Sequence, residues 1–339
     1  MRLGQFRAWA SALGLAVGLA AAASGLAQAQ TNVTFVSASP SGINVYPVLV
    51  AIGEGYFKDE GINVRWEALN GSGAILQALA AGQAQIGRPG PAPVMQARSR
   101  GVDVVFLYNS LPRSSFGILV KEGSAYKTPD QLKGKVIGVG TADGAEVGFA
   151  RAILADYGLK ENTDYKFIPV GDGGTATAGF LRGDIEAYAG SLADQAILNF
   201  RGMKVRDITP DKFQTLFGNG YVAMRSYIDA NPKVIEGFGR ALVRATRFTE
   251  DPKNRETVLK HLAAGMPSEV EDKGYANSLL DAVLAKGKPM DPSKGIGYQP
   301  PEHWEDWHKS AVATGTLKAP LDDIKKAYTN QFVDAWNKQ

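Results

Sequence analysis

The chain has 339 residues but no cysteine and only three histidines. The lack of cysteine excludes disulfides, thiolate metal ligands and thiol nucleophiles. Two of the histidines, His303 and His308, are five residues apart and fall on different faces of a helix, and no HExxH sequence is present. We therefore expect no metal site in this segment. We expect its Trp304 and Trp307 to pack the helix onto a core.

Signature sequences of nucleotide-binding proteins and hydrolases are also missing. The chain contains no GxxxxGK[ST], no GxGxxG and no GxSxG. The nearest approach to a dinucleotide loop, Gly138 to Gly144, has one residue too many before its last glycine. Basic residues are scattered, without a basic stripe or interleaved aromatic residues. We therefore expect no cofactor, no enzymatic activity and no nucleic-acid partner.

The first acidic residue is Glu54. Residues 1–29 combine Arg2 and Arg7 with an Ala/Leu-rich run and end in Ala-Gln-Ala, the small-x-small pattern of a signal-peptidase site. We predict a cleaved signal peptide over residues 1–29 and a periplasmic mature protein; an uncleaved membrane anchor is the alternative. Because residues 1–29 carry two of the 37 basic residues and none of the 34 acidic ones, the mature net charge is near +1. Such a charge gives no general attraction to nucleic acid or anionic membranes.

Strand-like and helix-like segments alternate through the first two thirds of the chain. This alternation indicates parallel α/β sheets. From about Pro232 onwards helical periodicity dominates. The predicted strands are Val33–Ser39, Ile62–Leu69, Gln85–Arg88, Val102–Tyr108, Phe116–Lys121, Lys135–Gly140, Tyr165–Val170, Ile185–Gly190 and Tyr221–Arg225.

The sequence repeats itself weakly after 101 residues. Val33–Gly90 aligns with Gly134–Ser191 without a gap, and glycines at the start of one helix-like segment, Gly73 and Gly174, coincide. Such a repeat predicts two similar βαβαβ lobes. The generic similarity of α/β units is the alternative explanation.

Loops rich in glycine, serine and threonine follow the predicted strands. Ligands of open parallel sheets bind beyond the carboxyl ends of the strands, where helices begin and offer free N–H groups. Arg88, at the end of a strand, is the first candidate for binding an anionic group, unless a one-residue shift turns it to solvent. Asp143 either caps a helix or binds an ammonium group, and Tyr46 either contacts the ligand or packs in the core. The candidate ligand-binding residues are Ser37, Ser39, Tyr46, Ser72, Gly73, Arg88, Thr141, Asp143, Gly174, Thr175, Ser191 and Asp194.

Several stretches resemble a known family: YFKDEGINV (Tyr56–Val64), ALAAGQAQIG (Ala78–Gly87) and LKGKVIGVG (Leu132–Gly140). With the signal-like N-terminus and the C-terminal helices, they resemble the periplasmic solute-binding proteins of ABC importers, of the nitrate/sulfonate/taurine type. Sulfonate binders of this family often carry Trp-Asp-Pro where this chain has Tyr188–Asp194. Pyrimidine-precursor binders open with a Trp-x-Pro-Asn-like stretch where this chain has Ser-Ala-Ser-Pro-Ser from Ser37.

The resemblance implies an α/β periplasmic-binding-protein fold of two lobes, each a mostly parallel sheet flanked by helices. With the repeat, it places residues 30–111 and 221–339 in lobe one, with the C-terminal helices packed on it, and residues 112–220 in lobe two. The hinge crossings would be Ser110–Gly117 and Phe217–Val222, whose small residues suit a hinge rotation.

The implied function is the binding of a small organic anion between the lobes of a monomer, which delivers it to an ABC permease and its ATPase. The expected solute is a sulfonate, a taurine-like zwitterion or a carboxylate, because helix N-termini and Arg88 favour anions. A neutral heterocycle, such as a thiamine or riboflavin precursor, is the alternative ligand. A periplasmic enzyme on the same fold is the alternative class.

Overall fold

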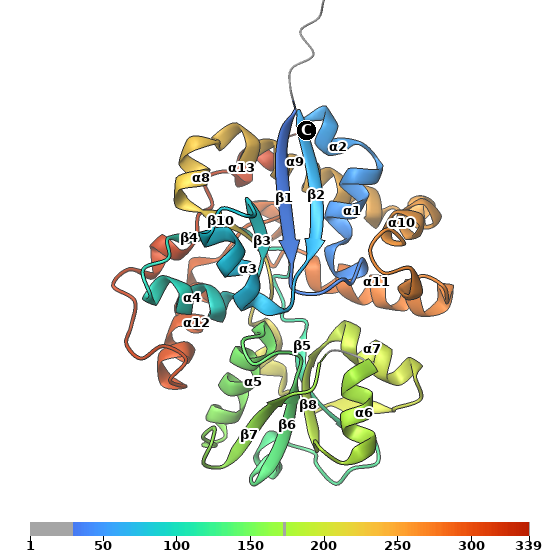
Figure 1. Ribbon diagram of the computed structural model, residues 1–339, viewed down its shortest axis with the longest axis vertical. Coiled ribbons are helices and arrows are strands. Elements are labelled where there is room, and N and C mark those ends of the chain that lie inside the picture. Colours follow the sequence, from blue (N-terminus) through green and yellow to red (C-terminus); the bar gives the residue numbers. More distant parts are fainter. Residues whose placement is uncertain (1–29, 172–173, 339) are drawn as a thin grey trace, which may run out of the picture.

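Two five-stranded sheets organise the chain and are stacked one above the other in Figure 1. The computed structural model describes residues 30–171 and 174–338. The predicted signal peptide, residues 1–29, lies outside them. The expected fold of mostly parallel sheets flanked by helices is confirmed. All nine predicted strands are present with ends that shift by at most two residues, and the structure adds Val205–Asp207.

The upper sheet in Figure 1 has the strand order β2-β1-β3-β10-β4. β1 pairs in parallel with β2 and β3, so that Phe35 lies opposite both Trp66 and Ile86. β10 runs antiparallel to β3 and β4. The strands are β1 (Thr31–Ser37), β2 (Ile62–Ala68), β3 (Ile86–Arg88), β4 (Val104–Tyr108) and β10 (Tyr221–Met224).

The lower sheet has the equivalent order β7-β6-β8-β5-β9. β6 pairs in parallel with β7 and β8, and β5 runs antiparallel to β8 and β9. In each sheet the antiparallel fourth strand, β10 or β5, is the one whose chain has just crossed from the other half of the molecule. The strands are β5 (Phe116–Lys121), β6 (Lys135–Val139), β7 (Tyr165–Pro169), β8 (Ala187–Ser191) and β9 (Val205–Asp207).

The strand registers support the internal repeat and correct its alignment by one residue. Val33 of β1 pairs with Val64, and Lys135 of β6 pairs with Tyr165. Val64 and Tyr165 are 101 positions apart, whereas Val33 and Lys135 are 102 apart. The gapless alignment is therefore wrong for the first strand, because the lower half has one residue fewer between its first two strands. In a strand, a one-residue shift turns each side chain to the opposite face.

Helices cover both faces of the upper sheet. On β1, Phe35 packs with α1 and α9, whereas its neighbour Val36 packs with α3, as the alternation of side chains along a strand requires. The helices are α1 (Tyr46–Gly53), α2 (Tyr56–Asp59), α3 (Gly71–Ala80), α4 (Pro91–Ser99), α5 (Ala145–Asp156), α6 (Gly174–Arg182), α7 (Leu192–Phe200), α8 (Arg225–Ala230), α9 (Pro232–Glu250), α10 (Arg255–Leu262), α11 (Lys273–Gly287), α12 (Pro301–Ala313) and α13 (Val333–Asn337).

The C-terminal helices do not all pack on the upper half alone. α9 and α13 do, but α12 contacts both α4 of the upper half and α5 of the lower half. Trp304 and Trp307 of α12 are buried, as expected from the sequence. The Trp304 ring lies 5.2 Å from that of Phe106 in β4, and the Trp307 ring lies 6.5 Å from that of Phe149 in α5. α12 therefore joins the hydrophobic cores of the two halves.

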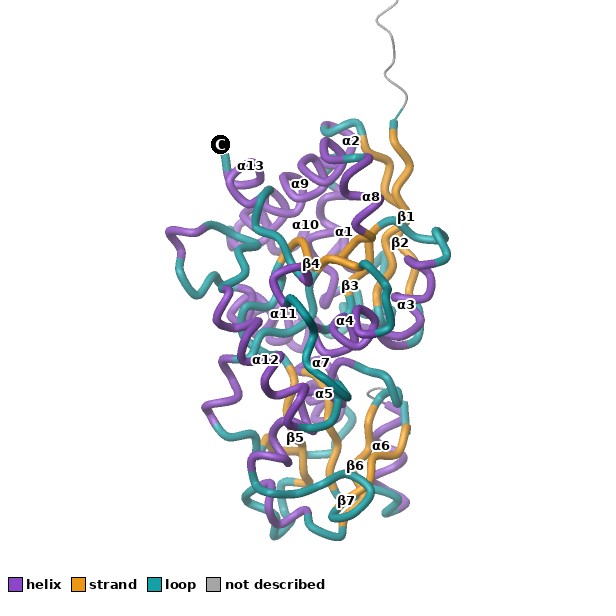
Figure 2. The backbone as a smooth tube through the Cα atoms, turned by 90° about the vertical axis from the view of Figure 1, so that its left-hand side faces the viewer, coloured by secondary structure: helices purple, strands orange, loops and turns teal. Residues whose placement is uncertain are grey.

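The two predicted crossings lie side by side between the sheets, which Figure 2 shows one above the other from the side. The amide of Gly218 in the second crossing donates to the carbonyl of Leu111 in the first (2.8 Å). The Ser110 hydroxyl donates to the carbonyl of Asn219 (2.6 Å). These bonds make the crossings one two-stranded connection. In the part of the chain that the structure describes, no helix combines the length and the hydrophobicity that a membrane span requires.

Candidate functional site

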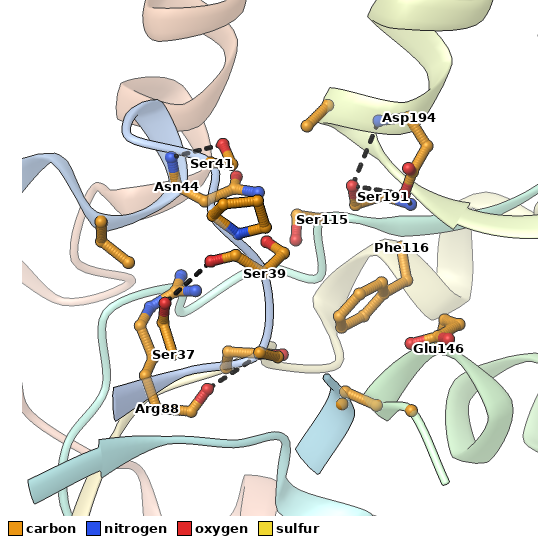
Figure 3. Close-up of a pocket in the computed structure, with 18 of the residues that line it drawn as sticks. Ser37, Ser39, Ser41, Asn44, Arg88, Ser115, Phe116, Glu146, Ser191 and Asp194 are labelled. Atoms are coloured by element: carbon orange, nitrogen blue, oxygen red, sulfur yellow. Dashed lines mark hydrogen bonds between the residues drawn. The ribbon is translucent and has the colours of Figure 1, made fainter. Parts of the chain in front are cut away.

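A cavity of about 200 Å³ lies between the two sheets. Residues at the ends of β1 and β3 line it from above, and residues at the starts of α5 and α7 line it from below. Figure 3 shows Arg88 and Ser37 on one side of this cavity and Glu146 and Asp194 on the other. The cavity is smaller than the roughly 300–1,000 Å³ typical of sites for drug-sized ligands. It therefore suits a small solute.

The structure brings most of the predicted site residues together. Those that line the cavity are Ser37, Ser39, Ser72, Arg88, Thr141, Ser191 and Asp194. Those outside the lining are Tyr46, Gly73, Asp143, Gly174 and Thr175. Gly174 and Thr175 begin α6, which follows β7. The start of α6 thus lies outside the lining, whereas α3, which follows the equivalent edge strand β2, contributes Gly71 and Ser72 to it.

Arg88 is buried in the cavity wall, with 7% of its surface exposed. Its Nε donates to the Ser110 hydroxyl (3.2 Å), and its backbone carbonyl accepts from the side-chain amide of Asn219 (3.3 Å). Among the described residues, no carboxylate lies within ion-pair distance of its guanidinium. Burial lowers its pKa, and the nearby Tyr221 and Tyr46 offset this only in part. The described residues thus supply no counterion for the buried guanidinium of Arg88.

Ser37 and Ser72 shape the cavity through bonds within the protein. The Ser37 hydroxyl donates to the carbonyl of Ser39 (2.8 Å) and accepts from the indole N–H of Trp66 (2.8 Å). The Ser72 hydroxyl accepts from the amide of Gly90 (3.3 Å) and so connects the start of α3 to the start of α4. These hydroxyls hold the loops around Arg88 in place.

Tyr46 belongs to the core. It is 6% exposed, and burial raises its pKa to about 12. Two roles were expected for Tyr46, contact with the ligand or packing in the core, and in the structure it packs in the core.

Carboxylates of the protein lie beside two of the helix N-termini that the sequence offers for a ligand. In α7, Ser191 and Asp194 form a capping box: the Asp194 carboxylate accepts from the Ser191 amide (2.8 Å), and the Ser191 hydroxyl accepts from the Asp194 amide (3.2 Å). At α5, Oε1 of Glu146 accepts from the amide of Thr141 (3.4 Å), in the loop that precedes the helix. The capping box of α7 thus uses the amides of Ser191 and Asp194, and binding of the solute at helix N-termini stays a prediction.

Asp143 closes the gap between the two halves at one edge of the cavity. A Cβ added to Gly73 would lie 1.7 Å from Oδ2 of Asp143, and one added to Gly71 would lie 2.6 Å from Oγ1 of Thr141. The Asp143 side chain thus lies directly against the first turn of α3. Gly144, and not Asp143, is the N-cap of α5. Glycine at position 73 permits this approach, because any side chain there would displace the carboxylate.

Sequence reasoning missed several lining residues. Three of them, Ser115, Phe116 and Asn219, lie in the crossings, whose sequences were predicted to be hinges. Glu269, in the 3-10 turn Pro267–Glu269, had no sequence signal, because it is more than 180 positions from Arg88. The missed residues with polar or large side chains are Ser41, Asn44, Ser115, Phe116, Glu146, Asn219, Met266 and Glu269.

The two sheets with a ligand-sized cavity between them define a periplasmic-binding-protein fold. The periplasmic aliphatic sulphonate binding protein SsuA from Escherichia coli has a similar structure, with a TM-score of 0.68 and 20% identity over 87% of this chain and 91% of SsuA. The periplasmic nitrate-binding protein NrtA from Synechocystis PCC 6803 gives a TM-score of 0.69 and 15% identity over 91% of this chain and 87% of NrtA. At these identities the likeness shows the fold alone.

A family model described as NMT1/THI5 like matches residues 42–254. The match covers more than half of the chain, which therefore belongs to the NMT1/THI5-like family.

Curated relatives carry names from more than one functional class. The riboflavin-binding protein RibY of Chloroflexus aurantiacus is 24% identical over 89% of this chain and 86% of its own length. A 4-amino-5-hydroxymethyl-2-methylpyrimidine phosphate synthase of Aspergillus parasiticus is 25% identical over 85% and 83%. The taurine-binding periplasmic protein of Escherichia coli is 27% identical over 59% of this chain and 62% of its own length. The relatives thus include both binding proteins and a synthase.

Proposed function

We propose that this protein is a periplasmic solute-binding protein that holds a small organic anion between its lobes and delivers it to an ABC permease and its ATPase. Lobe one comprises residues 30–111 and 221–339, lobe two comprises residues 112–220, and residues 1–29 are removed as a signal peptide. The protein acts as a monomer and leaves the solute chemically unchanged. The observation that carries this proposal is the buried, unneutralised guanidinium of Arg88 in the cavity wall.

A buried charge is costly unless a partner of opposite charge compensates it. The fork of guanidinium N–H groups matches the planar pairs of oxygen atoms in carboxylates and two oxygens of a sulfonate. A solute anion in the cavity would supply the counterion that the described residues do not. The burial of Arg88 is therefore best explained by a negatively charged ligand group.

Arg88 also connects the cavity to both crossings. Its Nε bonds to Ser110 in the first crossing, and its carbonyl accepts from Asn219 in the second. A solute bound to Arg88 would contact lobe two only when the lobes are closed, so that binding favours the closed form. The permease would then recognise the closed surface.

A binding screen on the purified mature chain tests the proposal. Thermal shift and calorimetry would be measured with sulfonates, carboxylates, nitrate and taurine. We expect at least one small anion to bind, and we expect Arg88→Gln to weaken it at least tenfold. The matched control is Arg65→Gln, which removes an exposed arginine paired with Glu67 on the edge strand β2. This control should bind as the wild type does.

Equal solute affinity in Arg88→Gln and in the wild type would contradict the proposal that an anion binds at Arg88. Conversion of a bound solute into a product would replace it with the enzyme alternative. X-ray scattering with and without the solute tests closure, for which we expect a smaller radius of gyration when the solute is bound.

A heterocycle binder is the second candidate, since the riboflavin-binding relative matches 89% of this chain. A flavin-sized ring binds best between flat aromatic side chains. Among the described residues that line the cavity, Phe116 is the one aromatic side chain. Titration with riboflavin, followed by its fluorescence, separates the two candidates. Quenching at micromolar concentrations would favour the heterocycle.

A further inference from the structure

Three polar atoms around the cavity are buried without a hydrogen-bond partner among the described residues. They are Thr141 Oγ1, Asn219 Oδ1 and Glu269 Oε1. Asn219 donates from its Nδ2 to the carbonyl of Arg88, which fixes its Oδ1 as the free acceptor. Buried polar groups in folded proteins are nearly always paired, so that a group left unpaired beside a cavity points to a ligand or water as its partner. Asn219 Oδ1 and the carboxylate oxygen Glu269 Oε1 can only accept hydrogen bonds.

Glu269 is the most unusual of the three. Glu269 is 2% exposed; its Oε2 accepts from the Ile43 amide (3.2 Å), whereas its Oε1 has no hydrogen-bond partner among the described residues. Burial raises its pKa, although the nearby donor groups of Ser41, Ile43 and Gly42 oppose the shift. A carboxylate in this position is costly while Oε1 has no donor. A positively charged donor on the solute would compensate both the lost hydrogen bond and the charge.

The charges around the cavity also favour a positively charged group on the solute. One guanidinium, Arg88, faces three carboxyl side chains, those of Glu146, Asp194 and Glu269. Asp194 and Glu146 accept from backbone amides, as described above. A solute with only negative charge would balance Arg88 but would also add repulsion with the three carboxylates. A solute that also carries an ammonium group avoids this repulsion.

Tyr275 offers a competing explanation within the protein. Its hydroxyl is also buried without a partner among the described residues, and Glu269 and Asp194 are among the charges that raise its pKa. A small rotation that let this hydroxyl donate to Glu269 would leave no need for a donor on the solute. Tyr275 does not line the cavity. Its hydroxyl can therefore be removed without altering the cavity wall.

We propose that the solute is a zwitterion whose anionic group binds Arg88 and whose protonated amine donates to Glu269. This inference rests on the proposed function, because it assumes that a small anion binds at Arg88. It narrows the substrate class from organic anions in general to short amino-sulfonates or amino-carboxylates. It also assigns to Glu269 the role of selecting for the amine.

Isosteric pairs of compounds test the role of the amine. Taurine and 1-propanesulfonate differ in that an ammonium group replaces a methyl group, and β-alanine and butyrate differ in the same way. Calorimetry on the mature wild-type chain should show at least tenfold tighter binding for the amine-containing member of at least one pair. Equal or tighter binding of the methyl-containing member in both pairs would overturn the inference, while the anion proposal would still stand.

Two variants locate the selectivity. Glu269→Gln keeps the size of the side chain but removes its charge, and it should reduce the preference for the amine at least tenfold with little change for the methyl-containing compound. Tyr275→Phe should leave the preference unchanged. A preference that survives in Glu269→Gln, or that is lost equally in Tyr275→Phe, would show that Glu269 does not bind the amine.

The outcomes also separate this inference from the proposed function. In Arg88→Gln, both members of a pair should bind more weakly, because both carry the anionic group. If neither member of either pair binds to the wild type and no other small anion does, both the proposed function and this inference fail. Melting curves of each variant without solute identify any loss of folding.

Discussion

The two lobes share one strand order but present different chemistry to the cavity. In lobe one, β3 ends in Arg88, and Gly90 is the N-cap of α4. At the positions 101 residues later, lobe two has Ala189 and Ser191, the latter as the N-cap of α7 in a capping box with Asp194. At these equivalent positions, lobe one places the cation of Arg88 beside the cavity and lobe two places the carboxylate of Asp194 there. The strand order is repeated, and the charges at these positions are not.

Small residues decide how closely α4 of lobe one and α5 of lobe two approach. A Cβ added to Gly90 would lie 2.3 Å from the Cβ of Ala145, and one added to Gly148 would lie 2.6 Å from the Cβ of Ala92. α4 and α5 thus approach closely at Gly90–Ala145 and at Ala92–Gly148, whereas Ser191 at the equivalent start of α7 lines the cavity. Gly90 permits the contact and caps α4 without a side chain, whereas its counterpart Ser191 caps α7 with its hydroxyl.

The largest expected effect is on stability, and it comes from a substitution in the core that both lobes share. Trp304 is fully buried and packs against Phe106 and Phe217. Trp304→Ala should lower the free energy of unfolding by about 3–5 kcal/mol, the usual loss for a large buried aromatic side chain. Urea unfolding measures this change. Leu181→Ala, which truncates a side chain that is 71% exposed, is the control and should change it by less than about 0.5 kcal/mol. A similar loss in both variants would contradict a shared core at α12.

The next effect tests the contact between the lobes. Gly90→Ala should disfavour the closed form by about 1–3 kcal/mol, because its Cβ would meet the backbone and Cβ of Ala145 in α5. Solute affinity should fall by about 5- to 150-fold, as measured by calorimetry, while the free energy of unfolding without solute changes little. Gly179→Ala is the control, since its nearest neighbours would be 3.5 Å away. Wild-type affinity in Gly90→Ala would show that the lobes close without this contact.

A smaller effect sharpens the difference between the two N-caps. Ser191→Ala removes the hydroxyl that accepts from the Asp194 amide (3.2 Å). Without solute, it should lower the free energy of unfolding by about 1 kcal/mol, the typical value for a lost cap. Gly90, which has no side-chain cap to lose, is the lobe-one counterpart. Stability within error of the wild type would mean that the capping box does not support α7.

The smallest effect is a change in how stability depends on pH. Burial raises the pKa of Glu269 above its unfolded value of 4.5. The protonated form is thus favoured in the folded state, so that Glu269 contributes stability below about pH 4.5 and loses it as the pH rises through the folded pKa. Relative to the wild type, solute-free Glu269→Gln should therefore be more stable at pH 7.5 than at pH 4.5. Urea unfolding at both pH values measures this difference, and a constant difference would show that Glu269 is not strained by ionisation.

Much of the scaffold and part of the site were predictable from the sequence. The nine strands follow from short apolar runs bounded by glycine and polar residues, which are local signals. Arg88 was identified because a strand ends there, and seven of the twelve predicted site residues line the cavity. The sequence does not show that the side chains of Asp143, Glu146 and Asp194 lie beside the first turns of helices.

The sequence by itself determined the α/β alternation, the repeat and the position of Arg88 at the end of a strand, because each depends on neighbours within a few residues or on a fixed spacing. The tertiary structure alone decided the role of Glu269, the approach of Asp143 to Gly73 and the shared core at α12. These features join residues from 70 to more than 180 positions apart. They exist only because the chain crosses twice between the sheets and brings loops of both halves to one cavity, where distance in space no longer follows distance along the chain.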